Sequence, residues 1–384
     1  MKKYFQISNK VILIDNYLFP RMLYIEETGI NNYPINSTGI LILSLCDGTR
    51  TEEDIVEYVS DYYKLEKEQI EQDIKQFLQK FVRQNIVRKS ECLNKINVDR
   101  RGKDNIILPF QLSFEVTNQC QLKCKHCYNE SGSKRNNEFE VYQIIDILKQ
   151  YKKLGGTSVM LTGGELFLKK DIFELLKYVY GNFMKIVLLS NAYSMSDELL
   201  NLLETMKDKI VIQVSLDGME EQHDLIRGVS GAFRKTIENI KRLVKREIAV
   251  CIGATLNSSN MKDIEGIVKY AKELGCVSIN IGVVTPQGRA KKTGVSGEDV
   301  LDGFETILSR LKNEYEDENF IVGRSEENCA ENCNMSENER KNICGAGYKI
   351  IHIFADGNVG MCPSSYGTLS KITLGNLKNP SELG

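Results

Sequence analysis

Hydrophobic and polar positions follow two different rhythms along the chain. Beyond about residue 108, short apolar runs typical of strands recur, and stretches with helical spacing separate them. The expected strands are 112–116, 158–162, 186–190, 210–216, 250–256 and 277–284. The expected helices are 140–154, 172–180, 197–206, 233–244 and 261–274, with one more at 298–315 after the sixth strand. Strands that alternate with helices predict parallel βα units, so the expected fold class is α/β with a partial (β/α)6 barrel.

Residues 1–91 have a different pattern and are expected to form a domain of their own. Apolar runs at 11–14, 22–25 and 33–35 predict strands. Helical spacing follows at 38–45, from 51 onward and at 66–84, and a last strand is expected at 86–88. Thr51 before a run of acidic residues predicts a capped helix start. Strands, three helices and a strand are typical of a winged-helix-like α+β domain.

The charge of this first domain bears on what it binds. Winged helices often bind DNA, but acidic residues outnumber basic ones among residues 1–91, which disfavours a phosphate footprint. A groove between a strand and a helix can instead hold an extended peptide that adds a strand to the open edge. The strand near 33–35 is the expected edge.

The rest of the chain divides around the barrel. Residues 92–107 are polar, lack periodicity and are expected to be a linker. The barrel is expected to span 108–320, followed by a small cysteine-rich region over 321–384. Within that region, Asp356-Gly357 lies between apolar runs at 350–354 and 359–361, which predicts a β-hairpin.

Composition narrows the functional classes. Fifty Lys and Arg against 52 Asp and Glu give a formal net charge of −2, so no global field favours nucleic acid or an anionic membrane. The apolar run at 11–14 is too short for a signal peptide, and no run has the length of a membrane span. The protein is therefore expected to be cytoplasmic. In that compartment its 11 cysteines stay reduced and suit metal ligation better than disulfides.

Seven of the cysteines fall into two groups. The first group is Cys120, Cys124 and Cys127, and the second is Cys329, Cys333, Cys344 and Cys362. The single cysteines, expected to be small buried hydrophobes, are Cys46, Cys92, Cys251 and Cys276. Structural zinc sites and iron–sulfur clusters normally take four protein ligands, so the first group leaves one metal position open for a substrate or cofactor. The second group has four thiols and suits zinc as well as an iron–sulfur cluster.

Polar residues follow several of the expected strands. They are Thr162-Gly163-Gly164-Glu165, Ser190-Asn191, Ser215-Leu216-Asp217-Gly218 and Asn257. Ligands in such folds bind at the carboxyl ends of the strands, where the first cysteine group also lies. Any one of these residues could simply form a βα turn. The adjacent glycines are more specific, because they allow a ligand to reach backbone carbonyls, and Glu165 adds an acceptor that suits an ammonium group.

Cys-x3-Cys-x2-Cys after the first barrel strand, together with Gly-Gly-Glu at the end of the second, resembles the radical S-adenosylmethionine (SAM) enzymes. The resemblance implies a [4Fe-4S] cluster on Cys120, Cys124 and Cys127, whose open iron binds the amino and carboxylate groups of SAM. The family motif often continues with proline, where this chain has Leu166. The positions that would bind SAM by this resemblance are Gly163, Gly164, Glu165, Ser190, Ser215, Asp217 and Arg227.

Two further likenesses narrow the family. Ser215-Leu-Asp217-Gly218, then His223 and Ile226-Arg227-Gly228, is similar to the ribose- and carboxylate-contacting region of the peptide-modifying branch. Cys344-x12-Gly357-x4-Cys362 is similar to the opening of its SPASM or twitch extension, which implies at least one auxiliary iron–sulfur cluster. The later cysteines of a full SPASM pattern would lie past Gly384. Either the chain is a truncated form, or Cys329, Cys333, Cys344 and Cys362 complete one site, as iron–sulfur or as zinc.

The first 91 residues resemble the precursor-recognition domain of peptide-modifying enzymes, which is related to the pyrroloquinoline quinone peptide chaperone. Asp47-Gly48-Thr49 and the apolar face of the helix between Ile70 and Phe81 carry this likeness. It implies that a precursor peptide binds here through its leader. Tethering the leader would raise the concentration of the core peptide at the barrel mouth.

The resemblances together imply a peptide maturase. One electron, supplied by a donor such as flavodoxin or ferredoxin, cleaves SAM, and the 5′-deoxyadenosyl radical abstracts hydrogen from a peptide carbon. The expected product is a thioether from a cysteine sulfur to carbon within the peptide. The alternatives are carbon–carbon crosslinking, oxidation to formylglycine as in sulfatase maturation, or a metal-cluster regulator that binds DNA. No general base is identified, because Asp217, Asp356 and the histidines are as readily structural.

Overall fold

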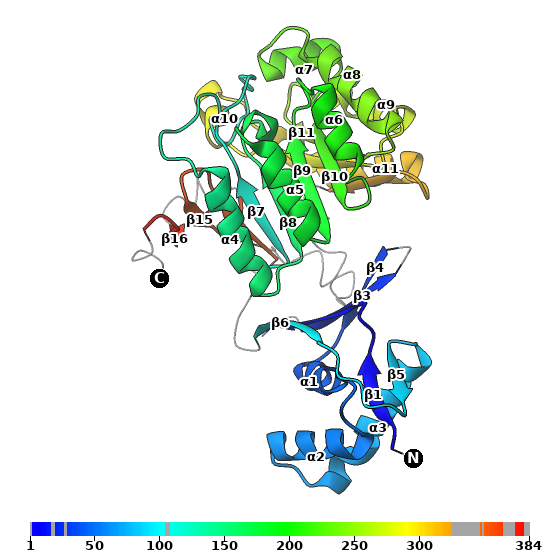
Figure 1. Ribbon diagram of the computed structural model, residues 1–384. Coiled ribbons are helices and arrows are strands. Elements are labelled where there is room, and N and C mark those ends of the chain that lie inside the picture. Colours follow the sequence, from blue (N-terminus) through cyan, green and yellow to red (C-terminus); the bar gives the residue numbers. More distant parts are fainter. Residues whose placement is uncertain are drawn as a thin grey trace. The chain divides into compact units, whose positions relative to one another are not determined.

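The structure is a computed structural model that describes residues 2–16, 20–26, 29–103, 108–324, 346–347, 349–363 and 373–379. The chain divides into two compact units (Figure 1). The first contains Met1–Leu108 with Lys153–Gly155, and the second contains Pro109–Lys152 with Gly156–Gly384. No helix in the described part of the chain has the length and apolar character needed to cross a membrane.

The first unit is an α+β domain with two small sheets. Its strands are β1 (Tyr4–Ile7), β2 (Val11–Asn16), β3 (Arg21–Glu26), β4 (Gly29–Pro34), β5 (Val87–Ser90) and β6 (Asp99–Lys103). Its helices are α1 (Ser37–Leu45), α2 (Glu52–Tyr63) and α3 (Lys67–Arg83). β1 pairs antiparallel with β5, and the other sheet has the order β4-β3-β2-β6. The helices and β2, β3 and β5 confirm the expected elements, with small shifts in their ends.

Local sequence explains where the helices of this unit begin and what they bury. The Thr51 hydroxyl accepts from the Asp54 backbone N–H at 3.3 Å, and the Asp54 carboxylate accepts from the Thr51 N–H at 2.8 Å. This capping box fixes the start of α2 where the sequence predicted it. On α3, Ile74, Leu78 and Phe81 are buried in the core shared with β1 and α1.

The segment 92–103 differs from the expected linker. Its residues 99–103 form β6, which pairs parallel with β2 from Ile12 opposite Asp99 to Asn16 opposite Lys103. The strand has no apolar alternation because it lies at the sheet edge and uses ion pairs. Arg100 pairs with the buried Asp15 at 2.5 Å, and Arg101 pairs with Asp99 at 2.6 Å. β1 was likewise not predicted.

The second unit is built on one sheet of ten strands in the order β13-β12-β11-β10-β9-β8-β7-β14-β15-β16. The barrel strands are β7 (Gln111–Glu115), β8 (Ser158–Thr162), β9 (Lys185–Ser190), β10 (Ile210–Ser215), β11 (Ala249–Leu256), β12 (Ser278–Val283) and β13 (Ile321–Arg324). All neighbouring pairs from β7 to β13 are parallel. The six expected strands and the partial-barrel fold class are therefore confirmed, and β13 adds a seventh parallel strand that was not predicted.

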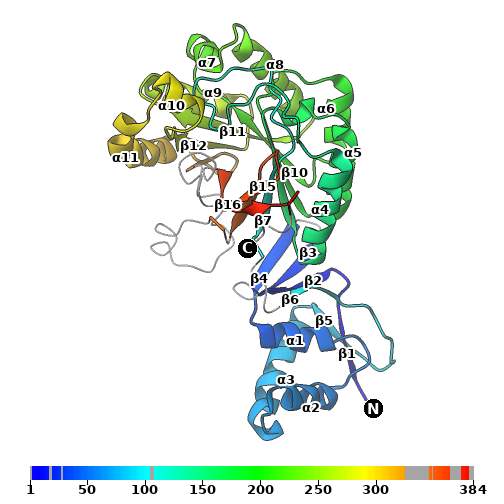
Figure 2. The ribbon, with the colours of Figure 1, turned by 90° about the vertical axis from the view of Figure 1, so that its left-hand side faces the viewer.

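Helices cover the outer face of this curved sheet (Figures 1 and 2). The helices of this unit are α4 (Val141–Lys153), α5 (Ile172–Asn182), α6 (Asp197–Glu204), α7 (Glu220–Arg227), α8 (Ala232–Lys245), α9 (Ile264–Glu273), α10 (Arg289–Thr293) and α11 (Glu298–Tyr315). Of these, α7 and α10 contact the loop that follows β7 and do not lie along the outer face. Single 3₁₀ turns precede α5 and α9, η1 (Leu166–Leu168) and η2 (Met261–Asp263). Of these helices, α7 and α10 were not expected.

The alternation of burial along β10 shows how the sheet is used. Ile210, Ile212 and Val214 are buried beneath the helices, whereas Gln213 and Ser215 are partly exposed on the opposite, inner face. Because the strands are parallel, their carboxyl ends and the loops that follow them come together at one edge. That edge holds the residues singled out in the sequence.

The C-terminal region extends the sheet beyond β7. β14 (Ile350–Ile353) pairs parallel with β7, and β15 (Asn358–Gly360) pairs antiparallel with β14 and with β16 (Thr373–Asn376). The expected hairpin is confirmed, and Gly357 takes the left-handed φ of +92° at its turn. Cys329, Cys333 and Cys344 lie outside the described residues, so the expected second group of cysteines stays a prediction.

Candidate active site

The first cysteine group lies on the loop between β7 and α4, here called the cluster loop (residues 117–132). Cys120, Cys124 and Cys127 pack around one small apolar cluster. The other members of this cluster are Leu122, Ala232, Tyr193 and Val229. The three thiols expected to act together are therefore brought together by the fold.

Each of the three sulfurs accepts a hydrogen bond. Cys120 Sγ accepts from the Leu122 N–H at 3.4 Å, and Cys127 Sγ accepts from the Ser131 N–H at 3.3 Å. Cys124 Sγ accepts from Arg227 Nη1 at 3.6 Å. Donors placed at all three sulfurs suit thiolates that carry negative charge.

Burial sets the protonation of these thiols in the absence of a metal. It raises the pKa of Cys120 to about 12 and also raises the pKa of Cys124. The thiols of Cys120 and Cys124 are therefore neutral at pH 7 unless a metal displaces their protons, as a coordinating metal does.

The spacing of the sulfurs distinguishes two kinds of metal site. Among the described residues, no group of three or more His, Cys, Asp and Glu side chains is placed to hold a single metal ion. A polynuclear cluster needs less closely spaced thiolates, because each can bind a different iron. The three donor-bonded sulfurs on one loop fit a [4Fe-4S] cluster with one iron left without a protein ligand.

The two glycines after β8 pack against the start of the cluster loop. The Gly164 N–H donates to the Thr117 carbonyl at 2.8 Å, and the Glu165 N–H donates to the Gln119 carbonyl at 2.8 Å. A Cβ on Gly163 would lie 2.4 Å from the Thr117 carbonyl oxygen, and one on Gly164 would lie 2.4 Å from that of Gln119. The sequence suggested that glycine serves access by a ligand; the structure adds that it lets the two backbones meet.

Replacing Gly163 with alanine is expected to destabilise the protein and to lower its iron content. Gly163 has φ +154° and no room for a Cβ, so the loop backbone must move, at a cost of about 1–3 kcal/mol. Gly132→Ala is the matched control on the same loop, because a Cβ there meets nothing within 4 Å. Urea unfolding and iron analysis measure both effects. If the two variants have equal stability and equal iron content, the close approach of Gly163 to the Thr117 carbonyl has no such role.

Glu165 joins the end of β9 to the cluster loop. Its carboxylate accepts from the Ser190 hydroxyl at 2.8 Å and from the Asn191 N–H at 2.8 Å. Asn191 Nδ2 in turn lies 3.7 Å from Cys120 Sγ. Burial raises the pKa of Glu165 to about 7, although Asn191, Ser190 and the more distant Arg227 oppose the rise. Glu165 Oε1 also accepts from the Phe167 N–H at 3.3 Å, so Oε2 is the oxygen that keeps capacity to accept from a ligand.

Stability of the metal-free protein is expected to fall as the pH rises from about 4.5 to about 7. In that window the unfolded chain has released the Glu165 proton, whose ordinary pKa is 4.5, while the folded state retains it. The shift corresponds to roughly 3 kcal/mol. Glu165→Gln is expected to flatten this part of the profile, whereas Glu174→Gln, at an exposed position of α5, leaves it unchanged. Denaturant midpoints at pH 5 and pH 7 decide the matter; an unaltered slope in Glu165→Gln would refute the assignment.

Asp217 and Arg227 form a buried ion pair behind the cluster loop. Their side chains are 0% and 8% exposed, and Arg227 Nη2 lies 2.6 Å from Asp217 Oδ2. Burial opposes the charge of Asp217, but the Arg227 guanidinium and a hydrogen bond from the Thr255 N–H help to hold the pKa of Asp217 below its ordinary value. Arg227 also places its positive charge beside Cys124 Sγ, through its other terminal nitrogen, Nη1.

The remaining expected site residues have different surroundings. Ser190 is buried and donates to Glu165, whereas Ser215 is half-buried on the inner face of β10. His223 receives the Asp217 N–H at 3.3 Å, and burial lowers its pKa to about 3, so it is neutral. Ser190 and Ser215 are the last residues of β9 and β10, and His223 lies on α7, the helix after β10.

Two buried carboxylates at this edge were not foreseen. Glu115 ends β7, and Glu138 accepts from the Thr117 hydroxyl at 2.8 Å and from the Asn118 N–H at 2.7 Å. Neither belongs to a motif. A glutamate inside an apolar run such as 112–116 is the only sequence signal, and it marks a buried charge without naming its partners.

Amide side chains lie on part of the inner face of the barrel sheet. Gln213, Gly253 and Asn280 lie on neighbouring strands, and Asn280 Nδ2 donates to Gln213 Oε1 at 3.2 Å. A Cβ on Gly253 would lie 2.8 Å from Gln213 Nε2, so glycine lets this side chain lie across the strand. Amide groups of this kind suit a peptide backbone as a neighbour.

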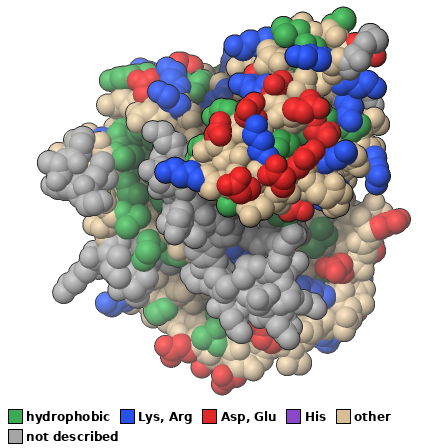
Figure 3. All heavy atoms as spheres, turned by 90° about the horizontal axis from the view of Figure 1, so that it is seen from below, with side chains coloured by type: hydrophobic (Ala, Val, Ile, Leu, Met, Phe, Trp, Pro, Cys, Tyr) green, Lys and Arg blue, Asp and Glu red, His purple; other side chains and the backbone are tan. Residues whose placement is uncertain are grey.

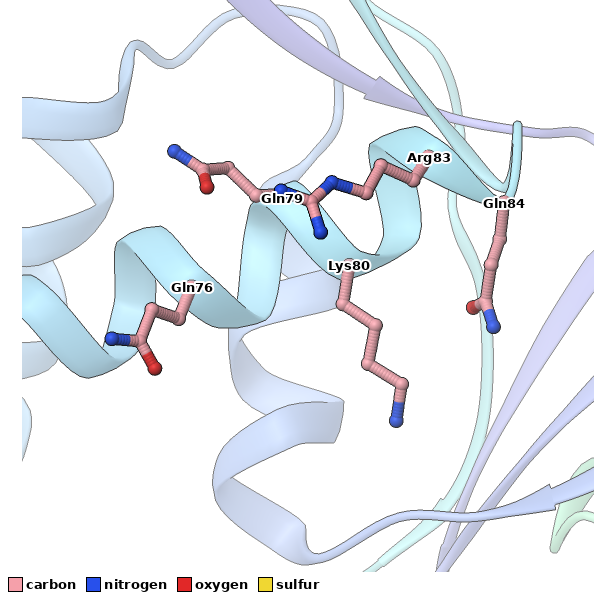
Figure 4. Close-up of a pocket in the computed structure, with 5 residues that line it drawn as sticks. All are labelled: Gln76, Gln79, Lys80, Arg83 and Gln84. Carbon is pink, nitrogen blue, oxygen red and sulfur yellow. The ribbon is translucent and has the colours of Figure 1, made fainter.

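The first unit carries a separate surface feature on α3 (Figure 4). The residues that line a shallow hollow there are Gln76, Gln79, Lys80, Arg83 and Gln84.

On the face seen in Figure 3, Asp and Glu side chains are interspersed with Lys and Arg and do not leave a continuous basic surface. This distribution does not resemble a nucleic-acid footprint.

Comparison with known proteins agrees with this geometry. Residues 114–271 match the model of the radical SAM superfamily, and residues 22–87 match that of coenzyme PQQ synthesis protein D (PqqD). The chain therefore carries a radical SAM domain and, before it, a PqqD-like domain. It is accordingly an enzyme whose family cofactors are a [4Fe-4S] cluster and SAM.

Particular relatives are similar over much of the chain. The antilisterial bacteriocin subtilosin biosynthesis protein AlbA of Bacillus subtilis is 27% identical over 85% of this chain and 71% of its own length. The sporulation killing factor maturation protein SkfB of the same species is 28% identical over 68% of this chain, which spans 62% of that relative. The structure is similar in fold to Streptococcus suis SuiB bound to precursor peptide SuiA, with a TM-score of 0.66 and 17% identity over 95% of this chain and 84% of that one.

Proposed function

We propose that this protein is a radical SAM maturase that forms an intramolecular thioether crosslink in a ribosomally made precursor peptide. The observation that carries the proposal is one chain that joins a PqqD-like domain to a radical SAM domain. The similarity to AlbA, whose name describes biosynthesis of the bacteriocin subtilosin, extends over 85% of this chain. SkfB, also named as a maturation protein of a killing factor, supports peptide maturation in general.

The cluster loop is the proposed cofactor site. Cys120, Cys124 and Cys127 would hold the [4Fe-4S] cluster, and their backbone and side-chain donors would stabilise its thiolates. SAM would lie against the strand ends that carry Gly163, Gly164, Glu165, Ser190, Ser215, Asp217 and Arg227. The bound cofactors supply the electron and the 5′-deoxyadenosyl radical, and the protein supplies binding and orientation. An electron donor such as flavodoxin or ferredoxin is part of the proposal.

The N-terminal unit is the proposed leader-binding domain. β4 is an edge strand of its sheet, paired on one side with β3, so an extended leader can add to it through backbone hydrogen bonds. The core peptide would then reach the amide-bearing inner face of the barrel at Gln213 and Asn280. Tethering raises its effective concentration there without requiring a tight core contact.

An auxiliary cluster in the C-terminal region completes the proposal. Cys362 follows β15 and is half-buried. We propose Cys329, Cys333, Cys344 and Cys362 as its ligands, with zinc as the competing occupant. Iron and sulfide counts on protein purified without oxygen distinguish the two, because a second iron–sulfur cluster raises both counts above those of one [4Fe-4S] site.

The function is tested by reaction of the anaerobically reconstituted protein with small peptides encoded beside its gene. The expected result is 5′-deoxyadenosine and a peptide lighter by two hydrogens for each crosslink, with one peptide thiol lost per crosslink. Loss of two hydrogens with all thiols retained would favour carbon–carbon crosslinking. Conversion of one cysteine to formylglycine would favour the oxidase alternative. Absence of iron and of SAM cleavage would overturn the enzyme proposal.

A further inference from the structure

A buried polar network connects the C-terminal hairpin to the cluster loop. At its centre is Glu115, which is 0% exposed and lies at the end of β7. Its carboxylate accepts from the Tyr128 hydroxyl at 2.8 Å and from Asn129 Nδ2 at 2.8 Å. Tyr128 and Asn129 directly follow Cys127, so Glu115 holds the end of the loop that carries this cysteine.

The other side of the same carboxylate is occupied by the C-terminal region. His352 Nε2 lies 3.1 Å from Glu115 Oε1, and His352 Nδ1 lies 2.8 Å from the Ser113 hydroxyl. The Ala355 N–H donates to Glu115 Oε2 at 3.4 Å. His352 is 0% exposed and belongs to β14, 237 residues from Glu115 along the chain.

A second connection runs in parallel with the first. Asp356, at the hairpin turn, accepts from Arg135 Nη1 at 3.1 Å, and Arg135 Nη2 donates to Asn129 Oδ1 at 3.0 Å. The side-chain amide of Asn129 is therefore held at both ends. Its nitrogen donates to Glu115, and its oxygen accepts from Arg135, which is itself held by Asp356. Two residues of the C-terminal hairpin thus act on the same residue of the cluster loop.

This network is more than strand packing requires. The backbone ladder from Ile350 opposite Gln111 to Ile353 opposite Phe114 already joins β14 to β7. A buried carboxylate is costly unless its acceptors are filled, and an apolar pair of similar size would pack the two strands as well. The donors on Glu115 come from the loop and from the hairpin, so the carboxylate couples these two segments.

We propose that His352 and Asp356 of the C-terminal hairpin are positioning residues for the radical SAM cluster, acting through Glu115 and Arg135 on Asn129 and hence on Cys127. The inference rests on the proposed cluster at the cluster loop. It gives the C-terminal region a role at the first cluster that does not depend on any auxiliary cluster. Loss of the network is expected to disturb the Cys127 side of the site while Cys120 and Cys124 keep their donors.

The test compares reconstituted full-length variants by electron paramagnetic resonance (EPR) of the reduced cluster and by the rate of iron loss to a chelator. His352→Leu removes both ring contacts and is expected to change the EPR line shape and to raise the rate of iron loss several-fold. His352→Gln, which can present an N–H toward Glu115, is expected to recover most of the wild-type signal. Asp356→Asn is expected to change the line shape in the same direction as His352→Leu, to a smaller extent.

Tyr128→Phe serves as the variant least expected to disturb folding, since it removes only the hydroxyl that donates to Glu115. Its control is Tyr151→Phe on α4, which removes a tyrosine hydroxyl that bonds to the Pro109 and Phe110 carbonyls at 3.1 and 3.2 Å. Tyr128→Phe is expected to alter the EPR signal and Tyr151→Phe to leave it unchanged. If both His352→Leu and Tyr128→Phe show the EPR signal and the rate of iron loss of the wild type, the positioning inference is overturned and the proposed function is not. A wild-type protein that takes up no iron–sulfur cluster would overturn the proposed function with it.

Discussion

Replacing Cys124 with alanine is expected to abolish both the iron–sulfur cluster of the barrel and the formation of 5′-deoxyadenosine. Cys124 is one of only three thiols on the cluster loop, and the remaining two would leave a second iron without a protein ligand. The side chain is 8% exposed, so water also reaches the vacated position poorly. Iron and sulfide counts, the visible absorption of the cluster and SAM cleavage measure the loss.

Cys276→Ala is the matched control for this variant. Cys276 is 3% exposed and lies after α9, outside the cluster loop, where it acts as a small buried hydrophobe. It is expected to retain the cluster of the barrel with little change in stability. Retention of a full barrel cluster in Cys124→Ala, or its loss in Cys276→Ala, would contradict the assignment of the ligands.

Replacing Arg227 with glutamine is expected to destabilise the protein and to make the cluster harder to reduce. Asp217 would remain buried without its partner, which typically costs about 3–5 kcal/mol. The variant also removes a positive charge that lies 3.6 Å from Cys124 Sγ. A nearby cation favours the more negative, reduced form of the cluster, so its loss moves the reduction potential to a more negative value.

A second substitution separates these two effects. Asp217→Asn combined with Arg227→Gln removes both charges and is expected to recover part of the stability, because no unpaired buried charge remains. The double variant also removes the negative charge of Asp217. Its reduction potential is expected to stay more negative than that of the wild type, because Arg227 is the member of the pair that contacts the sulfur. Arg310→Gln is the control, since it breaks the exposed ion pair with Glu265, where solvent screens the charges and little stability is lost.

Urea unfolding of the metal-free chains and EPR-monitored redox titration of the reconstituted proteins provide the measurements. An Arg227→Gln protein with wild-type stability would show that the pair is not buried as described. An unshifted potential would show that Arg227 does not act on the sulfur.

The barrel could be predicted from the sequence because its strands carry short apolar runs and its helices carry one apolar face. The elements that were missed lack this contrast. β6 lies at a sheet edge and consists largely of charged residues that pair with Asp15 and with one another. α7 has acidic and polar residues over most of its length and buries only His223, Ile226 and Arg227. Their structure depends on contacts that no local pattern records.

The same distinction applies to the site. The cluster loop and Gly-Gly-Glu were recognisable because their chemistry fixes residue type and spacing within a few positions. The network around Glu115 was not, because its partner His352 is 237 residues away and belongs to no motif. Spacing reveals ligands on one loop, whereas the residues that hold the loop are found only when the chain is folded.

The pairing of β14 with β7 also has a consequence during synthesis on the ribosome. The residues of β7 are made early, from residue 111, whereas those of β14, which pairs with one side of β7, emerge only when synthesis has passed residue 353. Until then Glu115 lacks His352, and the loop that carries Cys127 is held from one side alone. Insertion of the iron–sulfur cluster before that point would meet an incompletely supported site, so stable loading is expected only once residues 350–353 have emerged and paired with β7.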